Sequence, residues 1–444
     1  MPKFRILLLT NRDSDNVGDQ IIEATAISLI KGVMKNLGRS FEDFTITSRA
    51  ASIVSRRYMK TGDPRLIETA RRSISQSDVI IFGGAPLFNY AYQSFYLRTI
   101  KTLELAHEYN VPVIFSSIGV EPFDALDPRC LQLREALALP VVRQITTRDD
   151  LASLQRYVEG TGTPVAHVAD PAVFADAVFR SRPVDRPSRS RVGLVVTRAG
   201  IFADNGIEFP EHVQRAFWRD VVALLNERGY EPRLLTTGHF TDEVFLDAFL
   251  RSEGIPVASA ALPINSPEEL VRELQACDGV IAFRLHASIT SFAYGVPSIG
   301  LSWNFKVPYF YESVGYPDRA IPPAQWNAEH VVSALEQAMH EGVTKDEQFM
   351  MSVYTALFDG LKEVVAPDST RTSFTFSELE RELPPYPGTT AGQYRAKVRR
   401  KLRRTYENYQ IHATSGSDEA GAGSRALSGL RAAWRRLPGR RRGR

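Results

Sequence analysis

The chain has 444 residues, of which 43% are hydrophobic and 24% are charged, a composition typical of a globular protein with full apolar cores. At roughly 150 residues per domain, this length predicts two or three domains. No apolar run approaches the roughly 18 residues that a membrane-spanning helix needs, and the apolar segment at residues 6–10 is too short for the core of a signal peptide. These features exclude an integral membrane protein and favour a cytoplasmic one.

The chain contains two cysteines, Cys130 and Cys277. They are far apart and neither has a second cysteine at CxxC spacing, which excludes a disulfide framework and a cysteine-based zinc site. We expect both to be buried free thiols.

Charge is distributed unevenly along the chain. Residues 389–444 hold 15 Lys and Arg against 3 Asp and Glu, whereas the remaining residues hold 39 basic and 48 acidic side chains. An acidic body with a strongly basic tail suggests that the tail has a partner of its own.

The first half of the chain alternates between short apolar runs and longer helical patterns. Strand-like runs occupy residues 4–10, 78–82, 111–116, 144–147 and 165–168. Helical patterns at residues 21–37 and 97–109 lie between them, and the acidic pair at residues 149–150 suits the start of another helix. Near-continuous apolar strands that alternate with helices indicate a parallel sheet that is covered on both faces.

The same alternation resumes after a break. Residues 180–191 have no apolar periodicity and hold two prolines, as expected of a linker. Beyond the break, strands are predicted at residues 192–197, 233–237, 278–283 and 296–301, and helices at residues 211–228, 267–277, 285–294 and 345–365. Ser266 suits the N-cap of the helix that follows it, and Gly295 suits a helix end.

These elements predict an α/β protein with two doubly wound Rossmann-like domains that face a cleft, as in GT-B proteins. We assign residues 1–180 to an N-terminal domain on the acceptor side and residues 181–191 to a linker. Residues 192–366 form a C-terminal domain on the donor or anion side, and residues 385–444 form a basic, partly disordered tail. The cleft between two such domains is the default ligand site.

The most informative segment follows the predicted strand at residues 278–283. Arg284 and His286 stand at the carboxyl end of that strand, where a helix begins, and ligands of open α/β sheets bind at this edge. A guanidinium, an imidazole and the free N–H groups of a helix start together suit a phosphate or a carboxylate. In the alternative interpretation both residues are structural: Arg284 forms a salt bridge, and His286 makes its hydrogen bonds within the core. The Arg-x-His pattern at a strand-to-helix junction favours the functional interpretation.

Other strand ends carry polar residues as well. Asn304 and Lys306 follow the next predicted strand, Arg198 follows the first strand of the second domain, and Arg148 follows a strand of the first domain. For Arg198 and Arg148, a ligand-binding role and an ordinary surface arginine stay open. The sequence has no HExxH zinc motif, no Walker A loop, no Ser/His/Asp signature and no GxGxxG in residues 11–20. We expect neither a cofactor nor a metal ion.

Several of these segments resemble motifs of the polysaccharide pyruvyl transferase family. Residues 284–287 (RLHA), 295–300 (GVPSIG) and 304–307 (NFKV) look like the C-terminal signature of that family. Earlier segments that resemble family motifs, in family order, are 16–20 (NVGDQ), 82–87 (FGGAPL), 147–149 (TRD) with Ser153, and 170–172 (DPA). Ala85 and Pro86 depart from the usual third glycine of the Gly-rich loop, and the basic tail has no counterpart in the family pattern.

The resemblance implies an enzyme that transfers the pyruvyl group of phosphoenolpyruvate to two hydroxyls of a sugar, giving a ketal and phosphate. On that basis we expect Arg284 to bind the donor and His286 to act as general acid and base. Arg198 and Arg148 are candidates for a second donor clamp. Asn16, Gly18 and Asp19 face the same cleft, where Asp19 either orients an acceptor hydroxyl or stabilises a helix start. Gly83 and Gly84 are expected to let the ligand approach the backbone closely, and Asn304 and Lys306 to line the donor side.

Two other functions remain open. A two-lobed glycosyltransferase that uses a nucleotide sugar would have the same architecture, and a non-catalytic glycan-binding protein would bind glycans without consuming an activated donor. The expected partners are phosphoenolpyruvate and a glycan or lipid-linked sugar of the cell envelope or of an exopolysaccharide.

For the basic residues 395–404, contact with an anionic membrane surface at the inner face of the membrane and a solvated tail are both open. We do not expect a nucleic-acid partner.

Overall fold

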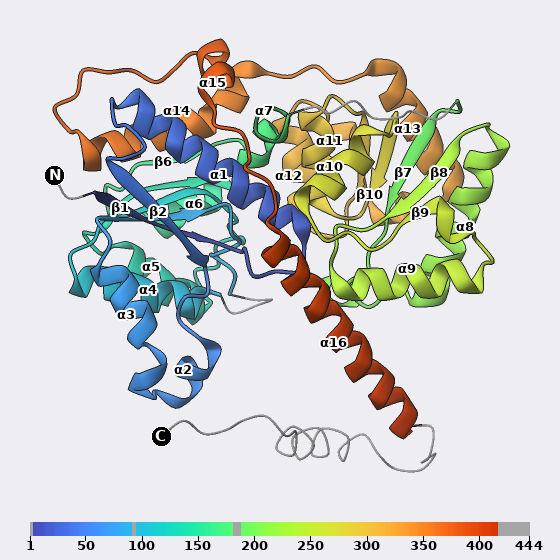
Figure 1. The fold of residues 1–444 in the computed structure, drawn as a ribbon, viewed down its shortest axis with the longest axis horizontal. Coiled ribbons are helices and arrows are strands. Elements are labelled where there is room, and N and C mark those ends of the chain that lie inside the picture. Colours follow the sequence, from blue (N-terminus) through green and yellow to red (C-terminus); the bar gives the residue numbers. More distant parts are fainter. Residues whose placement is uncertain (1–2, 91–94, 181–187, 416–444) are drawn as a thin grey trace. The chain divides into compact units, whose positions relative to one another are not determined.

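The computed structural model describes residues 3–90, 95–180 and 188–415. Within these residues, six parallel strands form a first sheet in the order β2-β1-β3-β4-β5-β6 (Figure 1). The strands are β1 Phe4–Thr10, β2 Phe44–Ala50, β3 Val79–Gly83, β4 Val113–Ile118, β5 Val142–Thr147 and β6 Val165–His167. The helices that connect them are α1 Val17–Asn36, α2 Arg56–Thr61, α3 Glu68–Ser75, α4 Tyr96–Glu108, α5 Pro128–Leu137, α6 Leu151–Tyr157 and α7 Ala175–Phe179.

Alternating side chains of the strands bury both faces of this sheet. In β1, Ile6 and Leu8 pack into the core that contains α1, whereas Leu7 and Leu9 pack into the core that contains α3, α4 and α5. All four side chains are at most 1% exposed. A strand that is apolar at every position therefore belongs inside a two-faced parallel sheet, as the sequence predicted.

A second parallel sheet, also of six strands within the described residues, has the order β12-β11-β10-β7-β8-β9. Its strands are β7 Arg191–Val195, β8 Glu231–Leu235, β9 Ala260–Ala261, β10 Gly279–Ala282, β11 Ser298–Leu301 and β12 Ala320–Ile321. Its helices are α8 Glu211–Glu227, α9 Phe240–Ser252, α10 Pro267–Gln275, α11 Leu285–Ala293, α12 Lys306–Ser313 and α13 Ala328–Glu341. Ser266 caps α10 in a capping box and Gly295 follows α11 with φ of 67°, which confirms both predicted boundaries.

The strand orders confirm the predicted fold class, an α/β protein with two doubly wound Rossmann-like sheets. In the first sheet the order reverses between β1 and β3, and in the second it reverses between β7 and β10. Loops that leave the carboxyl ends of these strands diverge to opposite faces and open a crevice for ligands.

Two predictions about elements need correction. The sequence analysis missed β2, because its segment, Phe44–Ala50, carries threonine, serine and arginine on an edge strand with one exposed face and offers no apolar run. Helix α1 starts at Val17 rather than at residue 21, because the Asn16 side chain caps it by accepting a hydrogen bond from the Gly18 N–H at 3.1 Å. The earlier start brings Gly18 and Asp19 into the first turn of the helix.

Helix α14 (Glu347–Val365) packs against the first sheet although it follows the second one in the chain. The Ser352 hydroxyl accepts a hydrogen bond from the Ala169 N–H at 2.9 Å, and the Tyr354 hydroxyl accepts one from Asn36 at 3.0 Å. The contacts of α14 are therefore those of the first lobe, although residues 347–365 fall in the range assigned to the C-terminal domain. The domain boundaries themselves stay predictions, and residues 181–187 of the predicted linker lie outside the described residues.

The C-terminal part of the chain separates from the rest. Residues 1–388 form one compact unit and residues 389–444 another. Helix α15 (Phe376–Glu382) belongs to the first unit, and α16 (Ala391–Ser415) is the described part of the second. The last residues of the predicted tail, 416–444, lie outside the described residues. Among the described helices, none has the length and apolar character to cross a bilayer. Both cysteines are buried free thiols, as predicted.

Candidate active site

The residues predicted to be functional stand at the carboxyl ends of strands in both sheets. Asn16 and Gly18 follow β1, and Arg148 follows β5. In the second sheet, Arg198 and Arg284 follow β7 and β10, the two strands between which the strand order reverses. Parallel strands bring such residues to one edge of a sheet, so the fold explains why residues far apart in the chain gather here.

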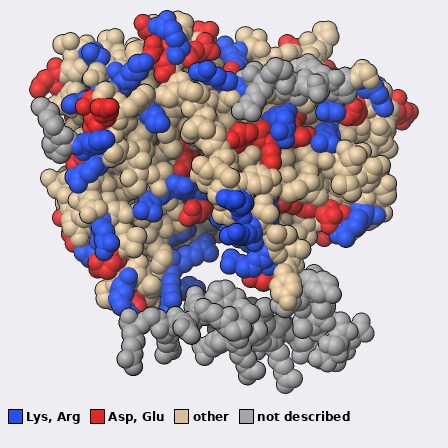
Figure 2. Space-filling view, in the orientation of Figure 1, with Lys and Arg blue, Asp and Glu red and all other residues tan. Residues whose placement is uncertain are grey.

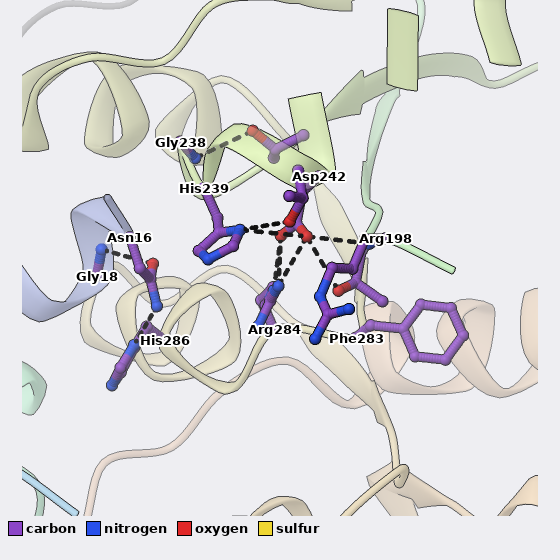
Figure 3. Close-up of polar contacts among 12 residues, drawn as sticks. Asn16, Gly18, Arg198, Gly238, His239, Asp242, Phe283, Arg284 and His286 are labelled. Atoms are coloured by element: carbon purple, nitrogen blue, oxygen red, sulfur yellow. Dashed lines mark hydrogen bonds and ion pairs between the residues drawn. The ribbon is translucent and has the colours of Figure 1, made fainter. Parts of the chain in front are cut away.

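His286 joins the two lobes. Its Nδ1 lies 3.3 Å from the Nδ2 of Asn16, the N-cap of α1. Gly18 lies directly against the imidazole, since a Cβ atom on Gly18 would come within 2.3 Å of the His286 Cβ. Only glycine allows helix α1 to approach His286 this closely. The sequence analysis proposed both residues for the site, and the structure brings them together (Figure 3).

The start of α1 contacts the second lobe through its backbone as well. The Val17 N–H donates a hydrogen bond to the Thr237 carbonyl oxygen, at 2.7 Å, just beyond β8. Gly238 follows with φ of 80°, and a Cβ there would come within 2.5 Å of the Ile264 carbonyl oxygen and 2.8 Å of the Val17 side chain. These contacts hold the N-terminus of α1 in the second lobe and position Asn16 beside His286.

Arg284 is held by a carboxylate that the sequence analysis did not name. Asp242, in the first turn of α9, is fully buried and accepts hydrogen bonds from the Arg284 Nε at 2.8 Å and Nη2 at 2.7 Å. The Arg198 N–H donates to the same carboxylate at 2.9 Å, and the His239 ring lies 3.8 Å from it (Figure 3). Arg284 therefore does form a salt bridge, and this bridge uses Nε and Nη2 of its guanidinium. No hydrogen bond joins Nη1 to another residue within the described part of the chain.

Arg148 also has a buried acidic partner. Its Nη1 donates to the Asp170 carboxylate, and both side chains are almost fully buried. Asp170 in turn accepts a hydrogen bond from the Ala172 N–H at 2.8 Å. Two segments that resemble family motifs, residues 147–149 and 170–172, are thus joined by one ion pair. Arg148 is not an ordinary surface arginine.

Lys306 differs from both arginines. It begins α12, where its backbone N–H donates to the Asn304 side chain at 3.1 Å. Its ammonium group forms no hydrogen bond or ion pair with any described residue. Burial lowers the pKa of Lys306, and the Asp149 carboxylate opposes that change. Lys306 is therefore a cation of the site without a committed counter-ion.

Burial also controls the ionisation of His286. Desolvation lowers the pKa of His286 well below its usual range, and the nearby cations of Arg148, Lys306 and Arg284 lower it further. Its Nε2 is buried and has no hydrogen-bond partner among the described residues. The imidazole is accordingly neutral at neutral pH.

Two buried carboxylates lie in the same electrostatic environment. Burial raises the pKa of Asp19 and of Asp149, while Arg148 and Lys306 oppose the change at both. Asp19 accepts a hydrogen bond from the Asn11 side chain at 3.1 Å, and Asp149 accepts one from the Val120 N–H at 3.2 Å. Burial thus favours the protonated form of both carboxyls, and the neighbouring cations favour the charged form.

The other predicted residues have mainly structural contacts. A Cβ on Gly84, where φ is 59°, would come within 2.4 Å of Ile22 in α1, and one on Gly83 within 3.2 Å of Leu8. These glycines thus allow α1 to pack closely on β3, and a ligand contact there stays a prediction. Arg198 is part-exposed, with its guanidinium 3.9 Å from Asp204. The Asn304 side chain supports the start of α12.

A pocket of about 300 Å³, which includes its open mouth, lies beside these groups. Its polar lining comes from both lobes: Arg148, Asp149 and Asp170 from the first, and Lys306 and Ser313 from the second. Apolar side chains complete it, among them Leu285 and Phe349. Within the described ranges of the chain, no group of three or more His, Cys, Asp or Glu side chains is placed to hold a metal ion.

Two doubly wound sheets with polar side chains at their carboxyl ends define the class of two-lobed α/β proteins of the GT-B type. Within that class, the family model of the polysaccharide pyruvyl transferases matches residues 16–304. The chain belongs to the polysaccharide pyruvyl transferase family. It is thus a transferase of polysaccharide biosynthesis, as its motifs predicted. A comparison with curated protein sequences gives no match.

Solved structures are similar to this chain at low sequence identity. A putative UDP-N-acetylglucosamine 2-epimerase from Listeria monocytogenes is 10% identical, with a TM-score of 0.54 over 84% of this chain and 100% of that one. An Escherichia coli heptosyltransferase is 14% identical, with a TM-score of 0.41 over 75% of this chain and 99% of that one. At these identities, the likeness to the epimerase concerns the fold alone.

The sequence analysis named the cations of the site but not their partners. Asp242 lies in the first turn of α9, where a carboxylate is common for structural reasons. It is 42 positions from Arg284 in the sequence, so nothing local links the two residues. Asp149 and Asp170 stood in the recognised motifs, although the sequence analysis gave them no role in the site. A carboxylate next to a strand end can indicate a partner for the cations of the site. Carboxylates at helix starts occupy the same positions for purely structural reasons, so the sequence does not distinguish the two.

Replacing Gly18 with alanine tests the contact with His286. Alanine favours a helix by about 1 kcal/mol over glycine. At Gly18 the clash with His286 should reverse that gain and cost about 1–3 kcal/mol of stability. Gly32 in the same helix is the matched control, because a Cβ there would meet its nearest neighbour at an ordinary 3.5 Å. Urea denaturation should show Gly18→Ala less stable than Gly32→Ala, and the opposite order would contradict the contact.

Replacing Asp242 with asparagine tests the buried ion pair. Removing one partner of a buried pair typically costs about 3–5 kcal/mol, because the other charge is left without compensation. We therefore expect Asp242→Asn to lower the thermal midpoint substantially. Asp247→Asn is the control on the same helix, since its pair with Arg251 is largely exposed and should matter little. Equal effects of the two variants would show that the Asp242 pair does not hold the site together.

The low pKa of His286 has a direct spectroscopic consequence. A histidine on the surface titrates near about pH 6.5, whereas His286 should remain neutral when the pH falls to that value. The Cε1 proton resonance that disappears in His286→Asn should show this behaviour in an NMR titration. The free energy of unfolding should also decline as the pH falls below about 6.5, the pKa of a histidine in the unfolded chain. Below that pH the unfolded chain binds a proton that the folded His286 does not bind. A resonance that is half-shifted at pH 6.5 would contradict the buried, neutral imidazole.

Proposed function

We propose that this enzyme transfers the pyruvyl group of phosphoenolpyruvate to a sugar of a cell-surface polysaccharide or glycolipid, forms a ketal and releases phosphate. The supporting observation is the position of His286, which α1 of the first lobe holds among the cations Arg148, Arg284 and Lys306. Membership of the pyruvyl transferase family supports the group that is transferred.

The donor carries a phosphate and a carboxylate and therefore needs cationic partners. In this proposal Lys306 supplies the principal charge, because the charges of Arg284 and Arg148 are balanced by Asp242 and Asp170. Arg284 adds directed hydrogen bonds from its remaining N–H groups, and the N-terminus of α11 adds partial positive charge. In this proposal Arg148 and Arg198, the candidates for a second donor clamp, and Asn304 complete the donor side.

His286 moves the protons in the proposed reaction. One sugar hydroxyl adds to C2 of phosphoenolpyruvate while C3 gains a proton and becomes a methyl group. The second hydroxyl then forms the other C2–O bond as the C2–O bond to phosphate breaks, and its proton ends on the departing phosphate. A neutral imidazole can accept a hydroxyl proton and return it to C3 or to phosphate. The anionic donor raises the pKa of the imidazole once it is bound, so the same residue can act as an acid.

The acceptor is proposed to bind on the side of the first lobe. Asp19 orients a hydroxyl there, and Asn16 and Gly18 hold His286 toward it. Gly83 and Gly84 are proposed to let the ligand approach the backbone closely. The proposed setting is the cytoplasm, where a lipid-linked sugar at the inner face of the membrane would serve as the acceptor.

Phosphate release from phosphoenolpyruvate, measured with a panel of glycan acceptors, tests this function. We expect release to depend on the acceptor and His286→Asn to slow it by about 10²–10⁴-fold, the usual contribution of general acid–base catalysis. His107→Asn is the matched control, because His107 is an exposed residue of α4 and should leave the rate unchanged.

Three outcomes would overturn the proposal. A His286→Asn enzyme with a near-normal rate would remove histidine from the proton transfers. A wild-type enzyme that binds a UDP-sugar, but neither binds nor consumes phosphoenolpyruvate, would favour the two-lobed glycosyltransferase interpretation instead. Glycan binding without consumption of either donor would favour a binding protein.

A further inference from the structure

Helix α16 carries a face that the proposed reaction does not use. Arg395, Arg399, Leu402, Arg403 and Tyr406 recur at the spacing of a single helical face, and all five are exposed. Leu402 is 63% exposed and Tyr406 is 61% exposed, which places both among the most exposed large apolar side chains of the described residues. We call these five residues the arginine face.

The charge of this helix is almost entirely positive. The sequence of α16 contains seven Lys and Arg and a single acidic residue, Glu407, which lies 3.8 Å from Arg403. Lys397 and Lys401 are buried, so the exposed cations of the helix are Arg395, Arg399 and Arg403. Elsewhere the surface is mixed, as Figure 2 shows Lys and Arg interspersed with Asp and Glu over the visible face of the two lobes. A helix that concentrates cations in this way is a candidate for contact with a polyanion.

The two apolar residues of the arginine face, Leu402 and Tyr406, favour a membrane surface over a nucleic acid as the polyanion. A leucine and a tyrosine that stand between arginines suit the boundary between lipid headgroups and acyl chains, where an amphipathic helix lies in the plane of the surface. Tyrosine is enriched at that depth because its ring is apolar and its hydroxyl is polar. A nucleic acid would contact mainly the arginines through its phosphates, whereas a membrane surface accommodates both the arginines and the two apolar side chains.

We propose that the arginine face of α16 binds an anionic membrane surface. The arginines supply the attraction to lipid headgroups, and Leu402 and Tyr406 enter the interface. This inference is independent of the proposed reaction. If both hold, membrane contact brings the enzyme to the surface on which lipid-linked sugars are carried.

The test uses the full-length protein and co-sedimentation with vesicles. We expect binding to vesicles of equal parts phosphatidylglycerol and phosphatidylcholine, little binding to phosphatidylcholine alone, and weaker binding at high salt. Each basic residue near an anionic surface contributes about fivefold in affinity, so a triple variant R395Q/R399Q/R403Q should bind about 100-fold more weakly. Glutamine has a helix propensity close to that of arginine, and circular dichroism checks that the helix is kept.

The matched control removes three exposed arginines from the lobes. Arg57, Arg65 and Arg251 are exposed, and R57Q/R65Q/R251Q makes the same change in net charge. That variant should bind vesicles like the wild type, whereas L402S/Y406S should weaken binding severalfold without any change in charge.

Three results would overturn the proposal. They are equal loss of binding in the two triple variants, unchanged binding of L402S/Y406S, and displacement from the vesicles by duplex DNA at equal phosphate concentration. The last result would assign the face to nucleic acid. Because vesicle binding is measured without phosphoenolpyruvate, its failure and a failure of the proposed reaction are separate outcomes.

Discussion

The close contact between Gly18 and His286 is the constraint on which the rest of the site depends. His286 belongs to the second lobe, but its ring is enclosed by the first turn of α1 from the first lobe. The hydrogen bond from Val17 to Thr237 and the packing of Gly238 hold that turn in place. If α1 withdrew, His286 would lose its hydrogen-bond partner and its shield from water together.

The positive charges around His286 would repel one another if carboxylates did not compensate them. Cations placed around the half-buried His286 imidazole disfavour its charged form, whereas the carboxylates of Asp242 and Asp170 compensate the charges of Arg284 and Arg148. Among the residues that the structure describes, the site thus holds two matched pairs and a neutral histidine, and Lys306 forms no ion pair. An anion that enters such a site meets directed donors without having to displace a salt bridge.

The sequence predicted the fold well because its signals were local. Apolar strands, the break at residues 180–191 and caps such as Ser266 each report on a few neighbouring residues. Edge strand β2 was missed because half of it faces solvent. The site was predicted less completely, because its decisive contacts join distant residues: Arg284 with Asp242, and Gly18 with His286. Gly83 and Gly84 show the same limit, since a sequence gives no sign that Leu8 packs closely against the first of them and Ile22 against the second.

The arrangement is suited to a reaction in which one group must first accept and then donate a proton. In the proposed transfer, the acceptor hydroxyl loses a proton before C3 or phosphate gains one, so a permanently charged residue could serve only one of the two steps. A histidine whose pKa is low in the free site begins as a base, and the charge of a bound dianion then raises its pKa. Burial raises the pKa values of Asp19 and Asp149, and the positive charges of Arg148 and Lys306 act on both carboxyls. In the proposed reaction, donor binding is therefore coupled to proton movement at His286.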